Sequence, residues 1–397
     1  MKRPELLAPA GNLEKLKTAL LFGADAVYVG NSIFGLRKYA DNFNSLELKE
    51  GIQFAHQRQK RVYVVLNGFA QESDLEPIKN YIKMLENLKP DALIISDIAV
   101  LQLAKQYSTI PIHISTQASA SNVLACNYYQ SMGASRIILA RELSITECKT
   151  ICTEFTGECE VFVHGAMCAS YSGKCVISNY TTGRDSNRGG CVQSCRHHYQ
   201  VQDQINGPII HETSLMNAKD LWSIKHLKSF CDMGMHSLKI EGRMKSNMYL
   251  ANVVSVYHRA LNELEKTGNI SNINLYETQL SQVSNRGFSD EHLSNSFHDK
   301  SMNTTTNSYY KNQELTAIIK AIKKDDGIIL ETKQSILNTD TLSCLNQSNI
   351  TTTLNDFTLL SLQNEQLSVS HANQLVKIKW QESFKNLRAF DILYKQI

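Results

Sequence analysis

Short apolar, β-branched runs alternate with amphipathic helical patterns through the first 245 residues of the chain. Near-continuous apolar strands separated by helices are typical of a parallel sheet with both faces covered. Repeated eight times at this spacing, the pattern favours closure into a barrel over an open sheet. The sequence therefore predicts an α/β fold, a (β/α)8 TIM-like barrel over residues 1–267. The predicted strands are Glu5–Pro9, Ala26–Gly30, Arg61–Asn67, Ala92–Asp97, Ile112–Thr116, Arg136–Ala140, Glu160–Gly165 and Ser237–Gly242.

The connection after the seventh predicted strand breaks this alternation. Residues 169–207 have little helical periodicity, and long irregular connections in compact domains are usually functional. Barrels carry their active sites at the carboxyl ends of the strands. Cys168 follows the seventh strand by three residues, so we predict that residues 166–207 form a cofactor-binding insertion at the barrel mouth.

The remainder of the chain predicts a second, smaller unit. Residues 247–266 have the pattern of a closing helix, and the stretch that follows is rich in Ser, Asn and Thr. We interpret residues 268–312 as a linker, partly disordered in its polar part. Short β-type runs without helices between them then predict a small β-rich C-terminal module over residues 313–397. These runs are Leu315–Ile322, Gly327–Thr332, Phe357–Leu362 and Leu375–Trp380.

Composition places the chain among soluble proteins. Of its 397 residues, 42% are hydrophobic and 20% charged, and the net charge of +3 neither indicates nor excludes binding to nucleic acid. No signal peptide is visible at the start of the sequence, and no apolar run approaches the roughly 18–20 residues of a membrane helix. We therefore expect a cytoplasmic protein with no membrane partner, whose thiols stay reduced.

Four of the ten cysteines cluster in the insertion, with the spacing Cys168-x6-Cys175-x15-Cys191-x3-Cys195. Structural zinc sites usually pair cysteines two to four residues apart, which fits the last pair alone. Iron–sulfur clusters take four thiolates at more varied spacings. The spacing favours a cluster, with zinc and unrelated thiols as alternatives. The other six are interpreted as small buried hydrophobic residues: Cys126, Cys148, Cys152, Cys159, Cys231 and Cys344.

Cations and glycines accompany these cysteines. Lys174, Arg184, Arg188 and Arg196 could offset the negative charge of four thiolates around a cluster. Glycines on either side let the backbone approach a bulky cofactor closely. The alternative, a flexible loop with solvated arginines, leaves four neighbouring cysteines without an explanation.

The same stretch resembles a known family. The segments EVFVHGAMC at 160–168 and GKCVIS at 173–178 are similar to the signature of the U32 family, long labelled collagenase-like peptidases. The segments LLAPAG at 6–11, GADAVYVG at 23–30, NRGGCVQSCR at 187–196 and KIEGRMKS at 239–246 agree with it in order. The resemblance covers about residues 3 to 267 and fades beyond about residue 300.

The resemblance implies an iron–sulfur protein that helps to hydroxylate an aromatic ring without using molecular oxygen directly. One branch of the family forms 5-hydroxyuridine at the wobble position of tRNA and depends on prephenate, and the length of this chain is most similar to that branch. Other branches modify a cytidine of 23S rRNA or act in pairs on a ubiquinone precursor. The implied cofactor is a [4Fe-4S] cluster on Cys168, Cys175, Cys191 and Cys195. The implied partners are the tRNA anticodon loop, prephenate and a second U32-type subunit.

The strand ends supply candidate substrate residues. Inward polar groups at this face of a barrel are typical substrate contacts, while phosphates and carboxylates bind Lys and Arg. Ion pairs with Glu142 or Glu241 are the alternative for Arg141 and Arg243. Candidates for substrate binding are Arg37, Asn67, Gln117, Arg141, Lys239 and Arg243; candidates for catalysis are His164, Arg141 and Arg243; and Asp97, Ser115, Thr116, Tyr171 and Lys245 are further polar or aromatic groups at the mouth.

Two other functions compete with an RNA hydroxylase. A peptidase, as the old family label suggests, needs an activated nucleophile or a metal-bound water. The sequence contains no His-Glu-x-x-His and no Gly-x-Ser-x-Gly motif, and Cys168 and Cys175 are better explained as ligands. A non-catalytic subunit of a hydroxylase complex is the third hypothesis.

Overall fold

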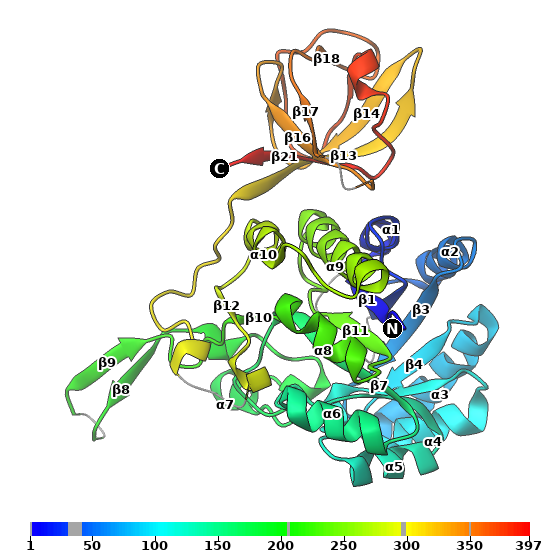
Figure 1. The fold of residues 1–397 in the computed structure, drawn as a ribbon, viewed down its shortest axis with the longest axis vertical. Coiled ribbons are helices and arrows are strands. Elements are labelled where there is room, and N and C mark those ends of the chain that lie inside the picture. Colours follow the sequence, from blue (N-terminus) through cyan, green and yellow to red (C-terminus); the bar gives the residue numbers. More distant parts are fainter. Residues whose placement is uncertain (1, 31–41, 205–206, 295–298, 349–350) are drawn as a thin grey trace.

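Eight parallel strands form a closed barrel in the computed structural model, which describes residues 2–30, 42–204, 207–294, 299–348 and 351–397. The eighth strand closes the barrel because it pairs in parallel with both the first and the seventh. The predicted (β/α)8 barrel is thereby confirmed, and every predicted strand overlaps an observed one (Figure 1). The barrel strands are β1 Glu5–Ala10, β2 Ala26–Gly30, β3 Arg61–Leu66, β4 Ala92–Ile95, β5 Ile112–Ile114, β6 Ala134–Ile138, β7 Glu158–Ala166 and β11 Ser237–Ile240.

Amphipathic helices surround the barrel, as their spacing of apolar residues predicts (Figure 1). Asn12 and Ser144 cap two of them, each accepting a hydrogen bond from a backbone N–H of the first turn. No helix in the described ranges is both long and apolar enough to cross a membrane. The helices are α1 Leu13–Leu21, α2 Ser45–His56, α3 Glu72–Leu88, α4 Ile98–Tyr107, α5 Val123–Ser131, α6 Ile145–Glu154, α8 Leu227–Asp232 and α9 Asn247–Thr267.

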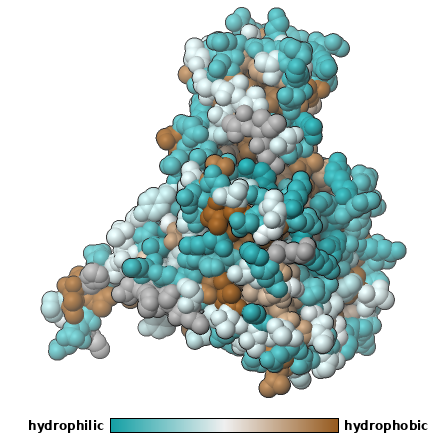
Figure 2. All heavy atoms as spheres, viewed as in Figure 1, coloured by the Kyte–Doolittle hydropathy of each residue, from teal (hydrophilic) through white to brown (hydrophobic). Residues whose placement is uncertain are grey.

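The long connection between β7 and β11 carries structure of its own. It holds the short helix α7 (Ile177–Thr182), the hairpin β8 (Tyr199–Gln202) and β9 (Ile209–Thr213), and β10 (Asp220–Trp222), which pairs antiparallel with the end of β7. The hairpin projects from the body of the molecule (Figure 1), and apolar side chains lie exposed along it (Figure 2).

The stretch interpreted as a linker, residues 268–312, is built onto the barrel. It contains α10 (Ile273–Ser281) and β12 (Phe288–Ser289), which pairs with β10. The amide of Asn217 donates to the carbonyl oxygens of Asn303, at 3.1 Å, and of Thr306, at 2.8 Å. Side-chain amides here satisfy backbone groups that a regular strand or helix would satisfy, so a polar composition typical of a linker accompanies an ordered structure.

The chain ends in an antiparallel module, as predicted. Its seven strands follow the order β17-β16-β21-β13-β14-β20-β18. Ile318, Ile392 and Tyr394 belong to the same buried cluster as the barrel core, so the module packs directly on the barrel. The strands are β13 Gln313–Lys323, β14 Gly327–Thr332, β16 Leu342–Leu345, β17 Thr351–Leu354, β18 Leu359–Leu360, β20 Leu375–Ile378 and β21 Ile392–Gln396; β15 Ile336–Leu337 and β19 Val369–Ser370 pair separately.

Candidate active site

A cavity of about 550 Å³ opens at the carboxyl ends of the barrel strands. This is the face where barrels carry their active sites, and the volume suits a small-molecule or nucleobase ligand. Its walls combine apolar side chains of the strands with polar groups of the loops that follow them. The residues that line it include Tyr28, Asn67, Ser115, Thr116, Gln117, Arg141, Glu142, Phe162, Tyr171, Lys239, Glu241, Arg243 and His292.

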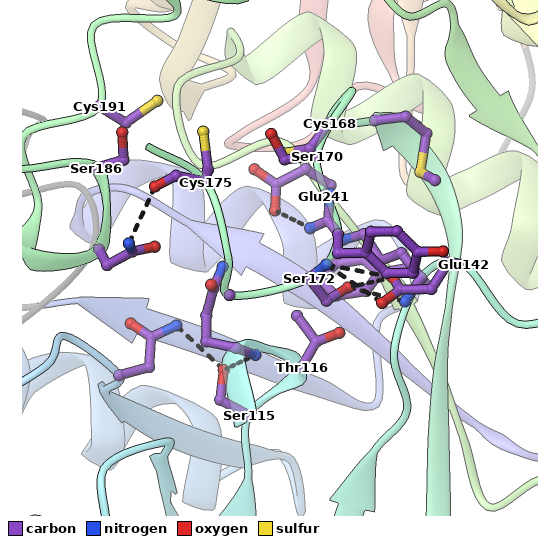
Figure 3. Close-up of a pocket in the computed structure, with 18 of the residues that line it drawn as sticks. Ser115, Thr116, Glu142, Cys168, Ser170, Ser172, Cys175, Ser186, Cys191 and Glu241 are labelled. Carbon is purple, nitrogen blue, oxygen red and sulfur yellow. Dashed lines mark hydrogen bonds and ion pairs between the residues drawn. The ribbon is translucent and has the colours of Figure 1, made fainter. Parts of the chain in front are cut away.

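All four cysteines of the insertion line this one cavity: Cys168, Cys175, Cys191 and Cys195. Each is a free thiol, with Cys168 exposed and the other three half-buried. Figure 3 shows three of them along one side of the cavity, opposite Ser115 and Thr116. Burial and the neighbouring thiols raise the pKa of Cys195, while the guanidinium of Arg196 acts against this rise. Among the described residues, no three His, Cys, Asp or Glu side chains are arranged to hold a metal ion.

The first cysteine loop is held by its contacts with the loop after β5. Gly173 has a φ of +72°, and a Cβ there would overlap with the carbonyl oxygen of Gln117. The hydroxyl of Ser119 donates to the carbonyl oxygen of Ser172, whose own hydroxyl donates to Glu142 at 2.7 Å. Glycine lets the two backbones meet, and these hydrogen bonds then fix the loop that joins Cys168 to Cys175.

The second cysteine loop is fixed in a similar way. The amide of Asn187 donates to the carbonyl oxygen of Cys175 at 3.0 Å, and the backbone N–H of Phe69 donates to the carbonyl oxygen of Asn187. Arg188 forms a 2.7 Å ion pair with Asp74 at the start of α3. Arg188 therefore supports the loop from the barrel side.

Arg196, next to Cys195 in the chain, is half-buried and interacts with the buried Arg286 and the half-buried Lys245. Arg196 donates to the carbonyl oxygens of Met167 and Ala218, and burial and the nearby Arg286 lower its pKa. Arg286 and Lys245 both pair with the buried Asp220, at 3.2 and 3.9 Å. Burial lowers the pKa of Lys245 to about 8.

These cations outnumber the acids that act on them. Asp220 acts on Arg196 and pairs with Arg286 and Lys245, and Glu241 acts on Lys245. Charge of one sign in a partly buried site needs a counter-charge. Arg196 was among the cations singled out from the sequence. The role of Arg286 was not predicted, because it lies in the stretch interpreted as a linker and reaches the site through the pairing of β12 with β10.

Three candidate cations of the cavity wall are already engaged within the protein. Arg141 stacks over the Phe162 ring and donates to the carbonyl oxygen of Ala166 at 2.9 Å. It also forms a 3.6 Å ion pair with Glu241, which the sequence offered as the alternative to substrate binding. Its Nε is buried without a hydrogen-bond partner among the described residues.

The other two cations are Arg243 and Lys239. Arg243 donates to Asn42 at 3.0 Å, and its guanidinium packs on Gly30, where a Cβ would overlap with it. Lys239 pairs with the fully buried Glu160 at 3.0 Å and lies over the Tyr28 ring. Burial lowers the pKa of Lys239 despite that partner.

His164 lies away from the cavity wall. It is 1% exposed, and its ring contacts Tyr249, Tyr257 and Phe288. Burial, followed by the charge of Lys245, lowers the pKa of His164 to about 3, so the ring is neutral near pH 7. Its catalytic role stays a prediction, and any such role is indirect because the ring does not line the cavity.

The remaining candidates divide between cavity and scaffold. Asn67 donates to Ser115 at 3.2 Å, and both line the cavity with Gln117. Asp97 caps α4 and is absent from the cavity wall. Arg37 lies outside the described residues, and Lys245 pairs with Asp220 and does not line the cavity. Tyr28, Glu142 and His292 also line the cavity and were not predicted as wall residues. Tyr28 lies inside a predicted strand, and Glu142 directly follows the candidate Arg141 in the chain.

Comparison with known proteins places this site in a family. The model of peptidase family U32 matches residues 11–303. The "tRNA hydroxylation protein P1" of Bacillus subtilis is 43% identical over 66% of this chain and 63% of its own length. A 23S rRNA 5-hydroxycytidine synthase of Escherichia coli is 36% identical over 68% of this chain and 41% of its own length. A "Collagenase" of Porphyromonas gingivalis is 31% identical over 72% of each chain.

The family match extends beyond the barrel to the stretch that supplies Arg286 and His292. The predicted resemblance is confirmed, although this chain spans less than two thirds of the B. subtilis relative. The match runs from α1 through the cysteine insertion to β12, and the chain belongs to peptidase family U32.

Proposed function

We propose that the protein is an iron–sulfur enzyme of the cytoplasm that hydroxylates the wobble uridine of tRNA to 5-hydroxyuridine, in a prephenate-linked reaction that does not use O2. The observation that carries the proposal is the set of four free thiols that line the barrel-mouth cavity, with the guanidinium of Arg196 close to them. The names of two hydroxylating relatives support it.

Cys168, Cys175, Cys191 and Cys195 would hold a [4Fe-4S] cluster. A cluster with four thiolates carries net negative charge, which fits the excess positive charge of Arg196, Arg286 and Lys245. A bound cluster would supply single-electron chemistry at the cavity wall. The proposal requires the thiols to converge further than they do here, because no three of the described metal-binding side chains are arranged for a metal ion.

The cavity can receive one base that has left its stack. A nucleobase reaches such a pocket only from a single-stranded or opened region, and the anticodon loop provides one. The rings of Tyr28 and Phe162 would exclude water from the bound base. Glu241, whose Oε2 accepts the Tyr28 hydroxyl at 3.2 Å, lines the same cavity and would contact the bound base.

Prephenate carries two carboxylates, which favour arginine partners. Arg141 and Arg243 are the proposed partners, since both line the cavity and Arg141 Nε has no protein acceptor among the described residues. Asn67, Gln117 and Lys239 would contact the substrate from the same wall. A second U32-type subunit is a further proposed partner.

Peptidase activity is the second candidate, because the family and one relative carry such names. A cysteine peptidase activates its thiol with a histidine. Among the described residues, no histidine hydrogen-bonds to any of the four cysteine thiols of the cavity. The geometry therefore favours the hydroxylase.

Deletion of the gene tests the proposed function. We expect total tRNA from the deletion strain to lose one oxygen from a wobble uridine, measured by nucleoside mass spectrometry. Wild-type protein should restore it, and anaerobically purified protein should contain about four irons and four sulfides. Cys168→Ala should restore neither the nucleoside nor the iron, whereas Cys152→Ala, outside the cavity, should restore both.

Other outcomes would reject the proposal. Unchanged tRNA with altered 23S rRNA or quinones would assign the chain to another branch of the family. Unchanged tRNA with gelatin cleavage by the purified protein would favour the peptidase. Stoichiometric zinc in a colourless anaerobic preparation would exclude the cluster.

A further inference from the structure

Aromatic and apolar side chains are exposed along the edge of the first cysteine loop and α7. Tyr171 is 72% exposed, Val176 63% and Tyr180 93%. Large apolar side chains exposed together mark a binding surface more often than a solvated face. The two exposed cations Lys174 and Arg184 alternate with them along the chain.

Cations outnumber acids along this edge. Residues 171–184 contain no Asp or Glu. Glu142 of another segment accepts the hydroxyl of Ser172 at 2.7 Å, and Asp185 accepts the backbone N–H of Asn187 at 2.8 Å, so both carboxylates have partners in the protein. A surface that combines exposed tyrosines with exposed cations suits a polyanion that also presents flat rings, which describes single-stranded nucleic acid.

The edge is continuous with the cavity. Tyr171 and Cys175 both line the cavity wall, and Lys174 lies between them in the chain. The backbone N–H of Tyr180 donates to the carbonyl oxygen of Val176 at 3.0 Å, so these two side chains stand one helical turn apart on the same side of α7. The exposed Val176 directly follows Cys175 of the cavity wall, so α7 begins at the rim of the cavity.

The edge is also held in place without a ligand. Thr181 donates to Ser194 at 2.7 Å, and the amide oxygen of Asn179 accepts the backbone N–H of Ser186 at 2.9 Å. The side chain of Tyr180 makes no hydrogen bond or ring contact with any described residue, and it is 93% exposed. A rigid backbone that presents an uncommitted ring loses little conformational entropy on binding.

We propose that Tyr171 and Tyr180, with Lys174 and Arg184, form a stacking platform for the nucleotides that flank the base in the cavity. The occupant is a single-stranded RNA loop: bases stack on the tyrosine rings, and phosphates meet the cations. The inference rests on the proposed function and adds to it the surface that holds the RNA outside the reaction pocket. Stacking on aromatic rings tolerates any base, so the platform contributes affinity rather than sequence specificity.

Binding of a synthetic anticodon stem–loop with a wobble uridine tests the platform, measured by fluorescence anisotropy with the anaerobically purified full-length protein. Tyr180→Ala should weaken binding by roughly 5- to 100-fold, the range for loss of one stacked base. Tyr180→Phe should bind as the wild type does, because the ring and not the hydroxyl is used. The matched control is Tyr128→Ala, a 57% exposed tyrosine on α5 outside the cavity wall.

Salt dependence tests the cations. Lys174→Ala should lower the slope of log Kd against log salt by about 0.7, the value for one phosphate contact in a single strand. Lys149→Ala, which removes an exposed lysine from α6, should leave the slope unchanged.

Equal affinities of the Tyr180→Ala and Tyr128→Ala variants would overturn the platform, even if the deletion strain lacks 5-hydroxyuridine. Equal loss of affinity for the stem–loop and for a fully paired duplex would also overturn it, because stacking requires unpaired bases. If binding depends on Tyr180 while tRNA in the deletion strain is unchanged, the platform stands and the proposed reaction fails. If the same variants lost affinity for a protein partner but kept their affinity for RNA, the occupant of this surface would be a protein, and the inference would be refuted.

Discussion

Gly173 illustrates how single residues fix the candidate site. It has a positive φ of +72°, and a side chain there would overlap with Gln117 across the contact that holds the first cysteine loop. Gly183 has nearly the same φ, +68°, but a Cβ at that position meets nothing within 4 Å. The two glycines therefore share the cost of a left-handed backbone and differ in the cost of close approach.

Substitution of these glycines separates the two costs. We expect Gly183→Ala to lower the free energy of unfolding by about 1 kcal/mol, the cost of a left-handed alanine. Gly173→Ala should cost about 3 kcal/mol or more, since a backbone must also move. Urea unfolding followed by circular dichroism measures both. Equal losses would show that the contact with Gln117 contributes nothing.

The residues that the sequence identified are those that act through local pattern. The four cysteines lie close together in the chain, and Arg141 and Arg243 directly follow predicted strands, so position in a barrel was enough to bring them to one cavity. Arg286 could not be found in this way, because its place beside the cysteines depends on a strand pair formed across more than 60 residues of chain. His164 occupies a strand whose side chains alternate, and its ring turned out to face the aromatic cluster instead of the cavity.

At the scale of elements, β7 belongs to two pairings at once. Its first part pairs with β6 and β11 inside the barrel, and its last residues pair antiparallel with β10. The loop of Cys168 leaves β7 directly after this second pairing. The position of the first cysteine is therefore set both by the barrel and by the segment that adds β10 and β12 to the sheet.

The contacts of Asn217 test whether that segment is held as described. Asn217 is fully buried and bonds to Arg196, Asn303 and Thr306. Asn217→Ala should lower the free energy of unfolding by about 3 kcal/mol, because it removes one acceptor of the Arg196 guanidinium and leaves the carbonyls of Asn303 and Thr306 without the amide donor. Hydrogen exchange of residues 301–309 should become faster. Asn87→Ala, at an exposed position on α3, should change neither.

The elements differ in how far the sequence could predict them. Barrel strands are buried on both faces and therefore read as apolar runs. The segment from 285 to 310 is ordered by long-range bonds to Asn217 and Arg286, which leave no periodic pattern. In the module, β16, β17 and β21 were not predicted, because half-buried antiparallel strands alternate apolar and polar residues over only four or five positions.

At the scale of the whole molecule, the module and the barrel share contacts. Lys320 on β13 bonds to Glu14 of α1 at 2.8 Å and to Glu331 of the module at 2.8 Å. Ile318 and Ile392 join the barrel's buried cluster. Apolar contact and a shared ion pair together fix the module against the helices α1 and α9, with which the strand β13 makes contact.

Asp391 makes the module sensitive to pH. It is fully buried between β20 and β21, and burial raises its pKa to about 6 against the opposing hydrogen bonds from Arg388 and Gln347. The folded state therefore binds a proton more tightly than the unfolded state. This contribution to stability is present below about pH 4 and is lost as the pH rises through about 6.

We expect the wild type to lose about 2 kcal/mol between pH 4 and pH 7 relative to Asp391→Asn, which mimics the protonated acid at every pH. Urea unfolding at both pH values measures the difference. Asp356→Asn, at an exposed position of the module, should follow the wild type. A difference that does not vary with pH would show that Asp391 keeps an ordinary acidity in the fold.

The closing pair β7–β11 also has a consequence for synthesis on the ribosome. Cys168 emerges long before the strand that closes the barrel, Ser237–Ile240, and longer still before Arg286. At roughly 5–20 residues per second, the thiols wait for many seconds without the cations and the wall that surround them in the finished protein. Whatever these sulfur atoms bind, the completed binding pocket is available only once nearly three quarters of the chain has been translated. Binding of a cofactor to the thiols is therefore a late event, and the nascent thiols stay open to oxidation until then.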